Sequence, residues 1–217
     1  MTIAPPAGAA PATEPVDVAA LVRAATAEDH RNAESRGFIT RLMGGELTLE
    51  DYTRYLAQFG WVYEALEERG ARAGDPDVFD PKLARLPAIE ADLAALGAAD
   101  WRETHPALPA TAAYAAHLRS ISDDDMRYLA HHYTRYLGDL SGGQAIAALV
   151  GRHYGATPEQ LSFYDFDLGA EGPVRYKRRY REAMNALALR PGQVDVLIEE
   201  AKASFRLNGA IFEALAA

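Results

Sequence analysis

The sequence of 217 residues contains no cysteine. The chain therefore forms no disulfide, binds no metal through a thiolate and holds no cysteine-bound iron–sulfur cluster. Basic residues are also scarce relative to acidic ones, because 22 Lys and Arg stand against 31 Asp and Glu and give a net charge of −9. Since a nucleic-acid-binding surface needs a positive potential, this balance argues against a nucleic-acid partner.

Long apolar runs and a basic N-terminus are lacking as well. No stretch approaches the ~18 apolar residues that span a bilayer, so we expect no membrane anchor. Residues 1–15 are rich in Ala and Pro and contain no Lys or Arg, whereas a secretory signal has a basic segment before an apolar core. The composition predicts a disordered tail over residues 1–15, a cytoplasmic location and one domain over residues 16–217.

Helical periodicity runs through the rest of the chain, and no period-two strand pattern persists. We therefore expect an all-α fold, a single-domain helical bundle. Asp17, Thr48 and Asp80 are suitable first residues for helices, and Gly97 is a suitable stop. The predicted helices cover residues 17–35, 38–43, 48–66, 80–97, 172–189 and 193–215, with further helices beginning at residues 109, 122 and 157.

Three glycines, Gly138, Gly142 and Gly143, lie between two helical patterns in the stretch from Tyr133 to Gln144. A glycine inside a helix costs roughly 1 kcal/mol against alanine, so three of them require a reason. Because glycine has no side chain, a flat ligand could lie against the backbone of Gly138 and Gly142, which share one helix face. The alternative explanations are close helix packing and a turn between two helices.

Residues 130–144, around these glycines, closely resemble the signature of the heme oxygenase family; they read Ala-His-His-Tyr-Thr-Arg-Tyr-Leu-Gly-Asp-Leu-Ser-Gly-Gly-Gln. The resemblance extends from about Asp17 to Leu215. It implies a helical bundle of the heme oxygenase type, with heme b between the first helix and a glycine-kinked distal helix. Heme would be both cofactor and substrate, and O2 would open it to biliverdin with release of iron and carbon monoxide.

His30 is the candidate iron ligand among the six histidines. Thr26 lies one turn before it, Glu34 one turn after it, and Arg23 about 10 Å away along the same helix face. Glu34 could orient the imidazole, and Arg23 could pair with a heme carboxylate; the alternative is an ordinary polar helix surface. Residues 26–34 resemble the family segment that carries the proximal histidine, which implies that His30 binds the iron.

A basic segment, residues 175–181, follows in the last third of the chain. Such a run is usually a solvated helix face, although in an acidic chain it could anchor two carboxylates or dock an acidic redox partner. The resemblance identifies it as the family's propionate-binding helix. The family often has lysine at the place of Arg23, so the charge is kept while the geometry differs. Besides Thr26 and Glu34, the implied heme-binding residues are Arg23, Tyr133, Ser141, Lys177, Arg181 and Phe205.

Asp139 directly follows the first glycine and would place one acid beside the ligand. The resemblance implies that Asp139 supplies protons through ordered water, while the glycine backbone forms the wall above the heme. The alternative role of Asp139 is a helix cap at the glycine bend. The same resemblance implies that His131 and His132 are structural and do not bind the iron. The implied catalytic residues are Asp139, Arg135, Tyr63, Gly138, Gly142, Gly143 and Asn208.

Three other classes of protein fit parts of the pattern: a heme carrier without turnover, a helical enzyme without heme, and a plain helical interaction domain. Asp139 argues against a carrier, since storage requires no acid on the distal side. A di-iron protein needs paired Glu-x-x-His motifs, which the sequence lacks. The resemblance further implies O2, an external reductase or ferredoxin as electron donor, and the α isomer of biliverdin. Iron acquisition, heme turnover and bilin supply are all compatible purposes.

Overall fold

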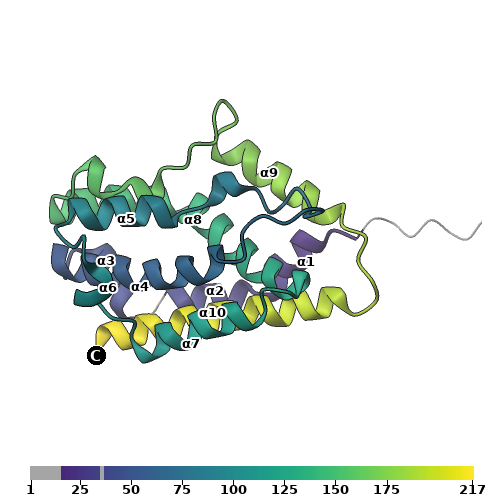
Figure 1. Cartoon of the computed structure of the whole chain (residues 1–217), viewed down its shortest axis with the longest axis horizontal. Helices are drawn as coiled ribbons and strands as arrows, with labels where there is room; N and C mark the ends of the chain where they lie inside the picture. The colour runs from purple at the N-terminus through teal and green to yellow at the C-terminus, as the bar shows by residue number, and fades with distance from the viewer. Residues whose placement is uncertain (1–15, 35–36) are drawn as a thin grey trace, which may run out of the picture.

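The computed structural model describes residues 16–34 and 37–217, and all regular structure within these ranges is helical. The predicted all-α class is therefore confirmed, while the predicted tail over residues 1–15 lies outside the described residues. Figure 1 shows the arrangement of the helices. The helices are α1 (Val18–Ala25), α2 (Ala27–Glu34), α3 (Gly37–Gly44), α4 (Leu49–Glu67), α5 (Leu86–Ala95), α6 (Trp101–Thr104), α7 (Pro109–Ser120), α8 (Asp125–Tyr154), α9 (Gly172–Asn185) and α10 (Gln193–Ala216), with short 3-10 turns η1 (Pro81–Leu83), η2 (Pro158–Gln160) and η3 (Ser162–Tyr164).

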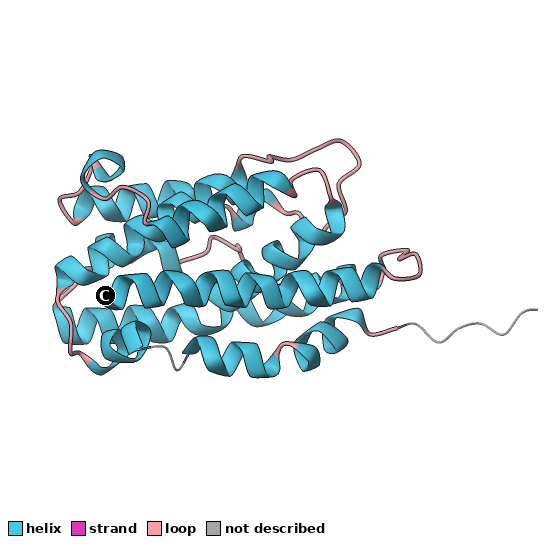
Figure 2. Cartoon of the chain, turned by 90° about the horizontal axis from the view of Figure 1, so that it is seen from below, coloured by secondary structure: helices cyan, strands magenta, loops and turns pink. Residues whose placement is uncertain are grey.

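Helix α10 runs along the bundle and contacts helices from both ends of the chain. It packs against α7 and α8, and also against α1, α2 and α3. Figure 2 shows the bundle from below, where the described chain consists of helices, loops and turns. Tyr55 and Phe59 of α4 meet Phe212 of α10, with ring centroids 6.2 Å and 6.1 Å apart. These rings belong to one continuous core of buried residues, which fixes the distance between α4 and α10.

Several predicted helix boundaries are confirmed. Thr48 and Asp51 form a capping box at the start of α4, in which Thr48 Oγ1 accepts a hydrogen bond from the Asp51 backbone at 3.1 Å. Asp17 caps α1 by accepting a hydrogen bond from the Ala20 backbone at 2.9 Å. The last predicted helix, residues 193–215, matches α10 to within one residue. Local capping chemistry therefore sets these boundaries.

Other boundaries were predicted wrongly. The first predicted helix is two helices, α1 and α2, separated at Thr26, whose hydroxyl donates to the Val22 carbonyl at 2.8 Å. The segment 80–97 begins as η1 and continues as α5 after a break, because Pro87 lacks a backbone N–H and its ring clashes with a continuing helix. α8 begins after Asp124, not at Ser122, since the Asp124 carboxylate accepts from the first backbone N–H groups.

Three further differences concern short elements. The helix predicted to begin at Thr157 is only the 3-10 turn η2. α9 ends at Asn185, four residues before the predicted end at Leu189. The four-residue helix α6, which begins at Trp101, was not predicted. None of these differences moves a predicted site residue to another element.

The glycine-rich stretch is not a turn between two helices, because α8 continues as one helix from Asp125 to Tyr154. Gly138, Gly142 and Gly143 all lie inside it. Asp139 also lies inside α8, far from either end, so its alternative role as a helix cap is wrong. A mid-helix acid beside two glycines requires an explanation from the surroundings of the helix.

Candidate active site

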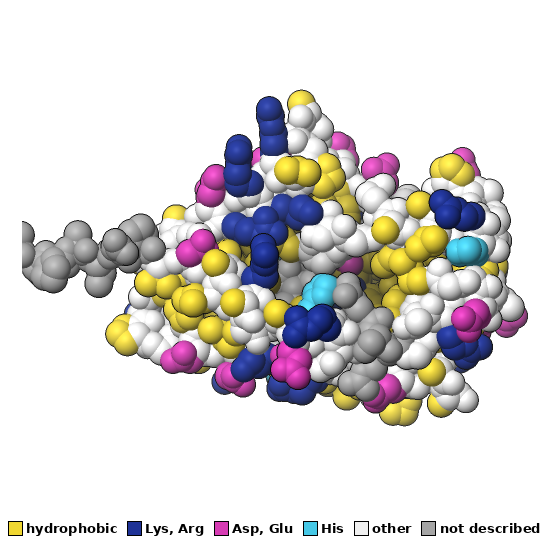
Figure 3. Space-filling model, turned by 180° about the vertical axis from the view of Figure 1, so that it is seen from behind, with side chains coloured by type: hydrophobic (Ala, Val, Ile, Leu, Met, Phe, Trp, Pro, Cys, Tyr) yellow, Lys and Arg dark blue, Asp and Glu magenta, His cyan; other side chains and the backbone are white. Residues whose placement is uncertain are grey.

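A cavity of about 730 Å³ opens between α1 and α2 on one side and α8 on the other, with α9 and α10 at its edges. Figure 3 shows a hollow on this molecule with Lys and Arg side chains gathered along one side and a histidine at its edge. Eight of the predicted site residues line the cavity: Arg23, Thr26, His30, Tyr133, Gly138, Ser141, Arg181 and Phe205.

A second cavity of about 320 Å³ adjoins the first and shares five lining residues with it, which are His30, Thr134, Gly138, Ser141 and Phe205. Its polar side contains the predicted catalytic side chains, and its other side is apolar. The predicted residues that line only this second cavity are Arg135, Asp139, Gly142 and Asn208. The apolar side consists of Ile39, Tyr55, Phe59, Ile146 and Phe212, which are not among the predicted site residues because they look like any buried helix face.

His30 projects from α2 into both cavities. Its imidazole packs edge-on against the ring of Phe205 from α10, with centroids 5.6 Å apart and planes at 68°. This contact restricts the orientation of the imidazole plane. Glu34, predicted to orient the same ring, ends α2, but its side chain lies outside the described part of the chain.

The three glycines of α8 serve two purposes. A Cβ atom added to Gly138 or Gly142 would meet no atom within 4 Å, so both residues face open space at the cavities. A Cβ atom on Gly143 would lie 2.9 Å from the ring of Tyr164. Gly143 therefore faces Tyr164 and lines neither cavity, and its missing side chain allows η3 to pack against α8.

Asp139 is the centre of a buried polar network. The hydroxyl of Tyr63 donates a hydrogen bond to its carboxylate. Arg135 Nη2 lies 3.6 Å from Asp139 Oδ1 and 3.3 Å from the Tyr63 hydroxyl, to which it donates. Arg135 Nη1 donates to Asn208 Oδ1 at 2.8 Å. The four predicted side chains of the catalytic set therefore form one connected group.

Burial raises the pKa of Asp139 above its ordinary value, while the Arg135 cation opposes this rise. The guanidinium itself is held over the ring of Phe59, with 4.4 Å between Cζ and the ring centroid. Asp139 is thus a rigidly placed acid with a weakened tendency to ionise. Such a group can hold a water molecule and exchange a proton with it.

Basic groups surround the other end of the larger cavity. Arg23 and Arg181 line it, and Lys177 Nζ donates to Ser141 Oγ at 3.0 Å, which connects α9 to α8. Burial, followed by the nearby Arg181 cation, lowers the pKa of Lys177. Crowded cations of this kind are stabilised by an anionic ligand. The cavity therefore suits a flat ligand with an apolar body, a site for an imidazole and anionic groups at one edge.

His131 and His132 lie away from both cavities, as the sequence predicted for structural residues. His132 Nδ1 is 2.7 Å from the Tyr180 hydroxyl, and burial lowers the pKa of His132 to about 3. His131 is fully buried and contacts Tyr114 and Glu200. His117 of α7 contacts the same Glu200 carboxylate, a contact that no sequence pattern indicated.

The chain is similar to known proteins over most of its length. The family model described as "Heme oxygenase" matches residues 16–214. The chain is 36% identical over 207 residues to heme oxygenase 1 of Gallus gallus, covering 92% of this chain and 70% of that protein. It is 32% identical over 206 residues to heme oxygenase 1 of a Nostoc species, and the match covers 92% of this chain and 86% of that protein.

Solved structures give the same result. The fold resembles the crystal structure of heme oxygenase-1 from Synechocystis in complex with heme, with a TM-score of 0.85, 30% identity and 92% of each chain covered. It also resembles heme oxygenase from Leptospira interrogans, with a TM-score of 0.85, 33% identity and coverage of 92% of this chain and 100% of that one.

The chain belongs to the heme oxygenase family. It is accordingly an oxygen-dependent oxidoreductase that degrades heme, and the alternatives of a carrier without turnover, an enzyme without heme and a plain interaction domain are set aside. Among the described residues, no helix combines the length and apolar character needed to cross a bilayer.

Proposed function

We propose that heme b binds in the larger cavity between α2 and α8, where His30 would hold its iron. One observation carries this proposal: His30 and the open face of Gly138 line the same two cavities from opposite helices. A flat ring can lie against α8 there because neither Gly138 nor Gly142 presents a side chain. When bound, the heme would supply the oxygen chemistry of the reaction.

The propionates of the heme are held by the basic edge of the cavity. Arg23 and Arg181 approach from α1 and α9, and the buried hydroxyl of Tyr133 lies at the same cavity. Lys177 reaches this edge from α9, where it already bonds Ser141. Contacts from two sides would fix the rotation of the heme in the cavity. Arg23, Lys177 and Arg181 also resemble the family's propionate-binding pattern, which supports the α isomer of biliverdin.

Asp139 holds and protonates water in the second cavity. The Tyr63 hydroxyl donates a hydrogen bond to its carboxylate, and the Arg135 cation, which is itself hydrogen-bonded to Asn208, lies 3.6 Å away as an ion pair. Because burial raises the pKa of Asp139, the proton it carries is retained to higher pH than that of an exposed aspartate. The apolar rings of Tyr55, Phe59 and Phe212 restrict the remaining water. The residues therefore deliver protons in a small, mostly dry space.

The reaction uses O2 and electrons from an external reductase or ferredoxin, and its products are biliverdin, iron and carbon monoxide. The exposed basic side chains of α9 beside the cavity support an acidic electron donor. Such a donor would approach the edge of the heme that the propionates occupy.

The ligand assignment is tested by His30→Ala, with the exposed surface residue His153→Ala as the matched control. Both variants are loaded with heme, and absorption spectra and biliverdin formation are recorded with a reductant in air. We expect His30→Ala to lose the spectrum of histidine-ligated heme and at least about 100-fold of the activity, whereas His153→Ala keeps both. An unchanged spectrum in His30→Ala contradicts the assignment.

A further inference from the structure

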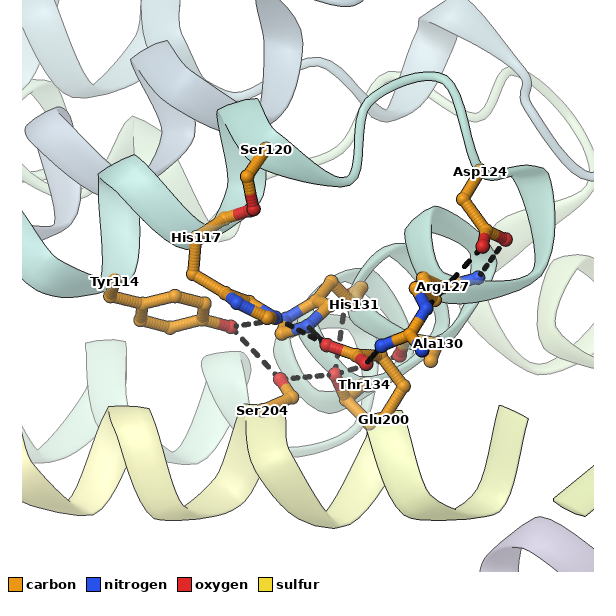
Figure 4. A network of polar contacts seen from close by, with 10 residues as sticks. All are labelled: Tyr114, His117, Ser120, Asp124, Arg127, Ala130, His131, Thr134, Glu200 and Ser204. Carbon is orange, nitrogen blue, oxygen red and sulfur yellow. Dashed lines mark hydrogen bonds and ion pairs between the residues drawn. The ribbon is translucent and has the colours of Figure 1, made fainter. Parts of the chain in front are cut away.

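Outside the two cavities, α7, α8 and α10 bring three metal-ligating side chains together. The ligand atoms of His117, His131 and Glu200 all lie within 4.8 Å of one another. His131 Nε2 is 3.0 Å from Glu200 Oε1, and His117 Nε2 contacts the same oxygen. Figure 4 shows both imidazoles directed at the Glu200 carboxylate, with His131 and Glu200 deep between the helices.

We propose that His117, His131 and Glu200 form a binding site for a divalent transition-metal ion, with Zn²⁺ as its representative and water as the fourth ligand. Two imidazoles and one carboxylate are a donor set that suits Zn²⁺, Co²⁺ and Fe²⁺. Mg²⁺ and Ca²⁺ prefer sites made of oxygen atoms and would not choose it. The site is distinct from His30, which lies on α2 at the heme cavity.

Hydrogen bonds from other side chains orient the proposed ligands His131 and Glu200. The Tyr114 hydroxyl lies 3.1 Å from His131 Nδ1, and Arg127 Nη1 donates to Glu200 Oε2 at 2.8 Å. These contacts occupy the outer atoms of both groups, whereas His131 Nε2 and Glu200 Oε1 face each other at 3.0 Å, where an ion would replace their direct contact. Metal-binding histidines and carboxylates are typically fixed in this way.

The geometry requires one small movement. In a tetrahedral zinc site with bonds of about 2.0–2.1 Å, ligand atoms are about 3.3 Å apart. His131 Nε2 and Glu200 Oε1, at 3.0 Å, nearly meet this spacing already. His117 must move outward, and it is free to do so because its side chain is 30% exposed. The same exposure gives a metal ion and its water ligand access from solvent.

The experiment titrates Zn²⁺ into the heme-loaded chain, in which the heme occupies His30, and follows the heat of binding. We expect one ion per chain with a dissociation constant of about 1 μM or lower, and a higher unfolding temperature with zinc. Zinc-edge X-ray absorption should show two imidazoles among the ligands. His117→Ala should weaken binding by about 100-fold, and Tyr114→Phe by about 10-fold through loss of its contact with His131.

His153→Ala, which removes another partly exposed histidine from α8, should bind zinc as tightly as the original chain. His117 is partly exposed, so His117→Ala should remain folded even if a change at the buried Glu200 does not. Equal zinc binding by the original chain and His117→Ala would overturn the proposal. The proposal would also be overturned if zinc did not bind stoichiometrically, or if fewer than two imidazoles were among its ligands. The cluster would then be a group of hydrogen bonds that joins the three helices.

Discussion

Gly138 and Gly143 lie on one helix but face different surroundings, so the same substitution should have opposite effects on stability. A methyl group on Gly138 would enter open space, and alanine is preferred to glycine inside a helix by about 1 kcal/mol. Gly138→Ala should therefore raise the unfolding temperature of the heme-free chain. Because the methyl group enters the proposed heme site, the variant should also bind heme more weakly.

Gly143→Ala is the matched comparison. Its methyl group would lie 2.9 Å from the Tyr164 ring, so η3 must shift away from α8. We expect a loss of about 1–3 kcal/mol in the free energy of unfolding, measured by denaturant titration of the heme-free chain. If both variants were equally stable, the distinction drawn between the two glycines would be wrong.

Asp139 gives a second prediction for a single residue. Asp139→Asn keeps the size of the side chain but removes its acid, while His30 and the basic edge of the cavity are untouched. The variant should bind heme with an unchanged spectrum and lose roughly 100-fold in the rate of biliverdin formation. Biliverdin and O2 consumption are measured together, and the variant should consume O2 without forming product. Biliverdin formation at the original rate would show that the acid is dispensable.

The elements show which boundaries a sequence can predict. The capping box at the start of α4 depends on Thr48 and Asp51, which are three residues apart, so it can be predicted from the sequence. The start of α5 is capped by Glu67 of α4, whose carboxylate accepts from the Arg85 and Leu86 backbones at 2.6 Å and 3.1 Å. That cap depends on the packing of α4 against α5, so it cannot be predicted from the residues next to Leu86.

The site was predicted unevenly for the same reason. The resemblance identified His30, Asp139 and the basic residues, because they belong to continuous motifs. It also included Gly143, since spacing alone does not show that Tyr164 packs against this glycine. The polar cluster of His117, His131 and Glu200 joins α7 and α8 to α10, which lies far from both in the chain, so no local pattern predicts it.

The link between the end of α4 and the start of α8 depends on Arg69. Its side chain is only 2% exposed and lies between the rings of Phe79 and Tyr128, 4.6 Å from each centroid. Asp75 accepts two hydrogen bonds from it at 2.7 Å and 2.9 Å, and Asp125 accepts a third at 2.9 Å. The buried cation thus depends on two carboxylates from different segments.

Asp75→Asn should cost about 2–3 kcal/mol in the free energy of unfolding at neutral pH, because Asp125 compensates only part of the charge. Arg69 holds the pKa of Asp75 below its ordinary value of 3.8. The stabilisation is therefore present above that value and is lost as pH falls through the lowered pKa. Urea titrations across pH should show that the free energies of unfolding of the original chain and Asp75→Asn converge in acid. A difference between them that persists in acid would contradict this account.

On the scale of the whole molecule, the charge is unevenly distributed. The chain carries a net charge of −9, yet Lys and Arg side chains gather beside the hollow in Figure 3. Arg23 and Arg181 line the cavity, whereas Arg175 and Arg178 of α9 are exposed to solvent. The inner pair can hold the heme while the outer pair remains available to an acidic electron donor, so one basic patch can serve both purposes.

The outer pair can be tested without disturbing the inner one. The side chain of Arg178 is 74% exposed, and its ion pair is with Glu182 on the same helix at 3.6 Å. Arg178→Glu should slow turnover driven by an acidic ferredoxin by about 10-fold at low salt, and the difference should shrink as salt screens the charges. Turnover driven by a small chemical reductant should be unchanged. Arg54→Glu, at an exposed arginine of α4 with an intrahelical partner at 3.4 Å, is the matched control. Equal slowing by both variants would indicate that net charge, not the α9 surface, governs electron delivery.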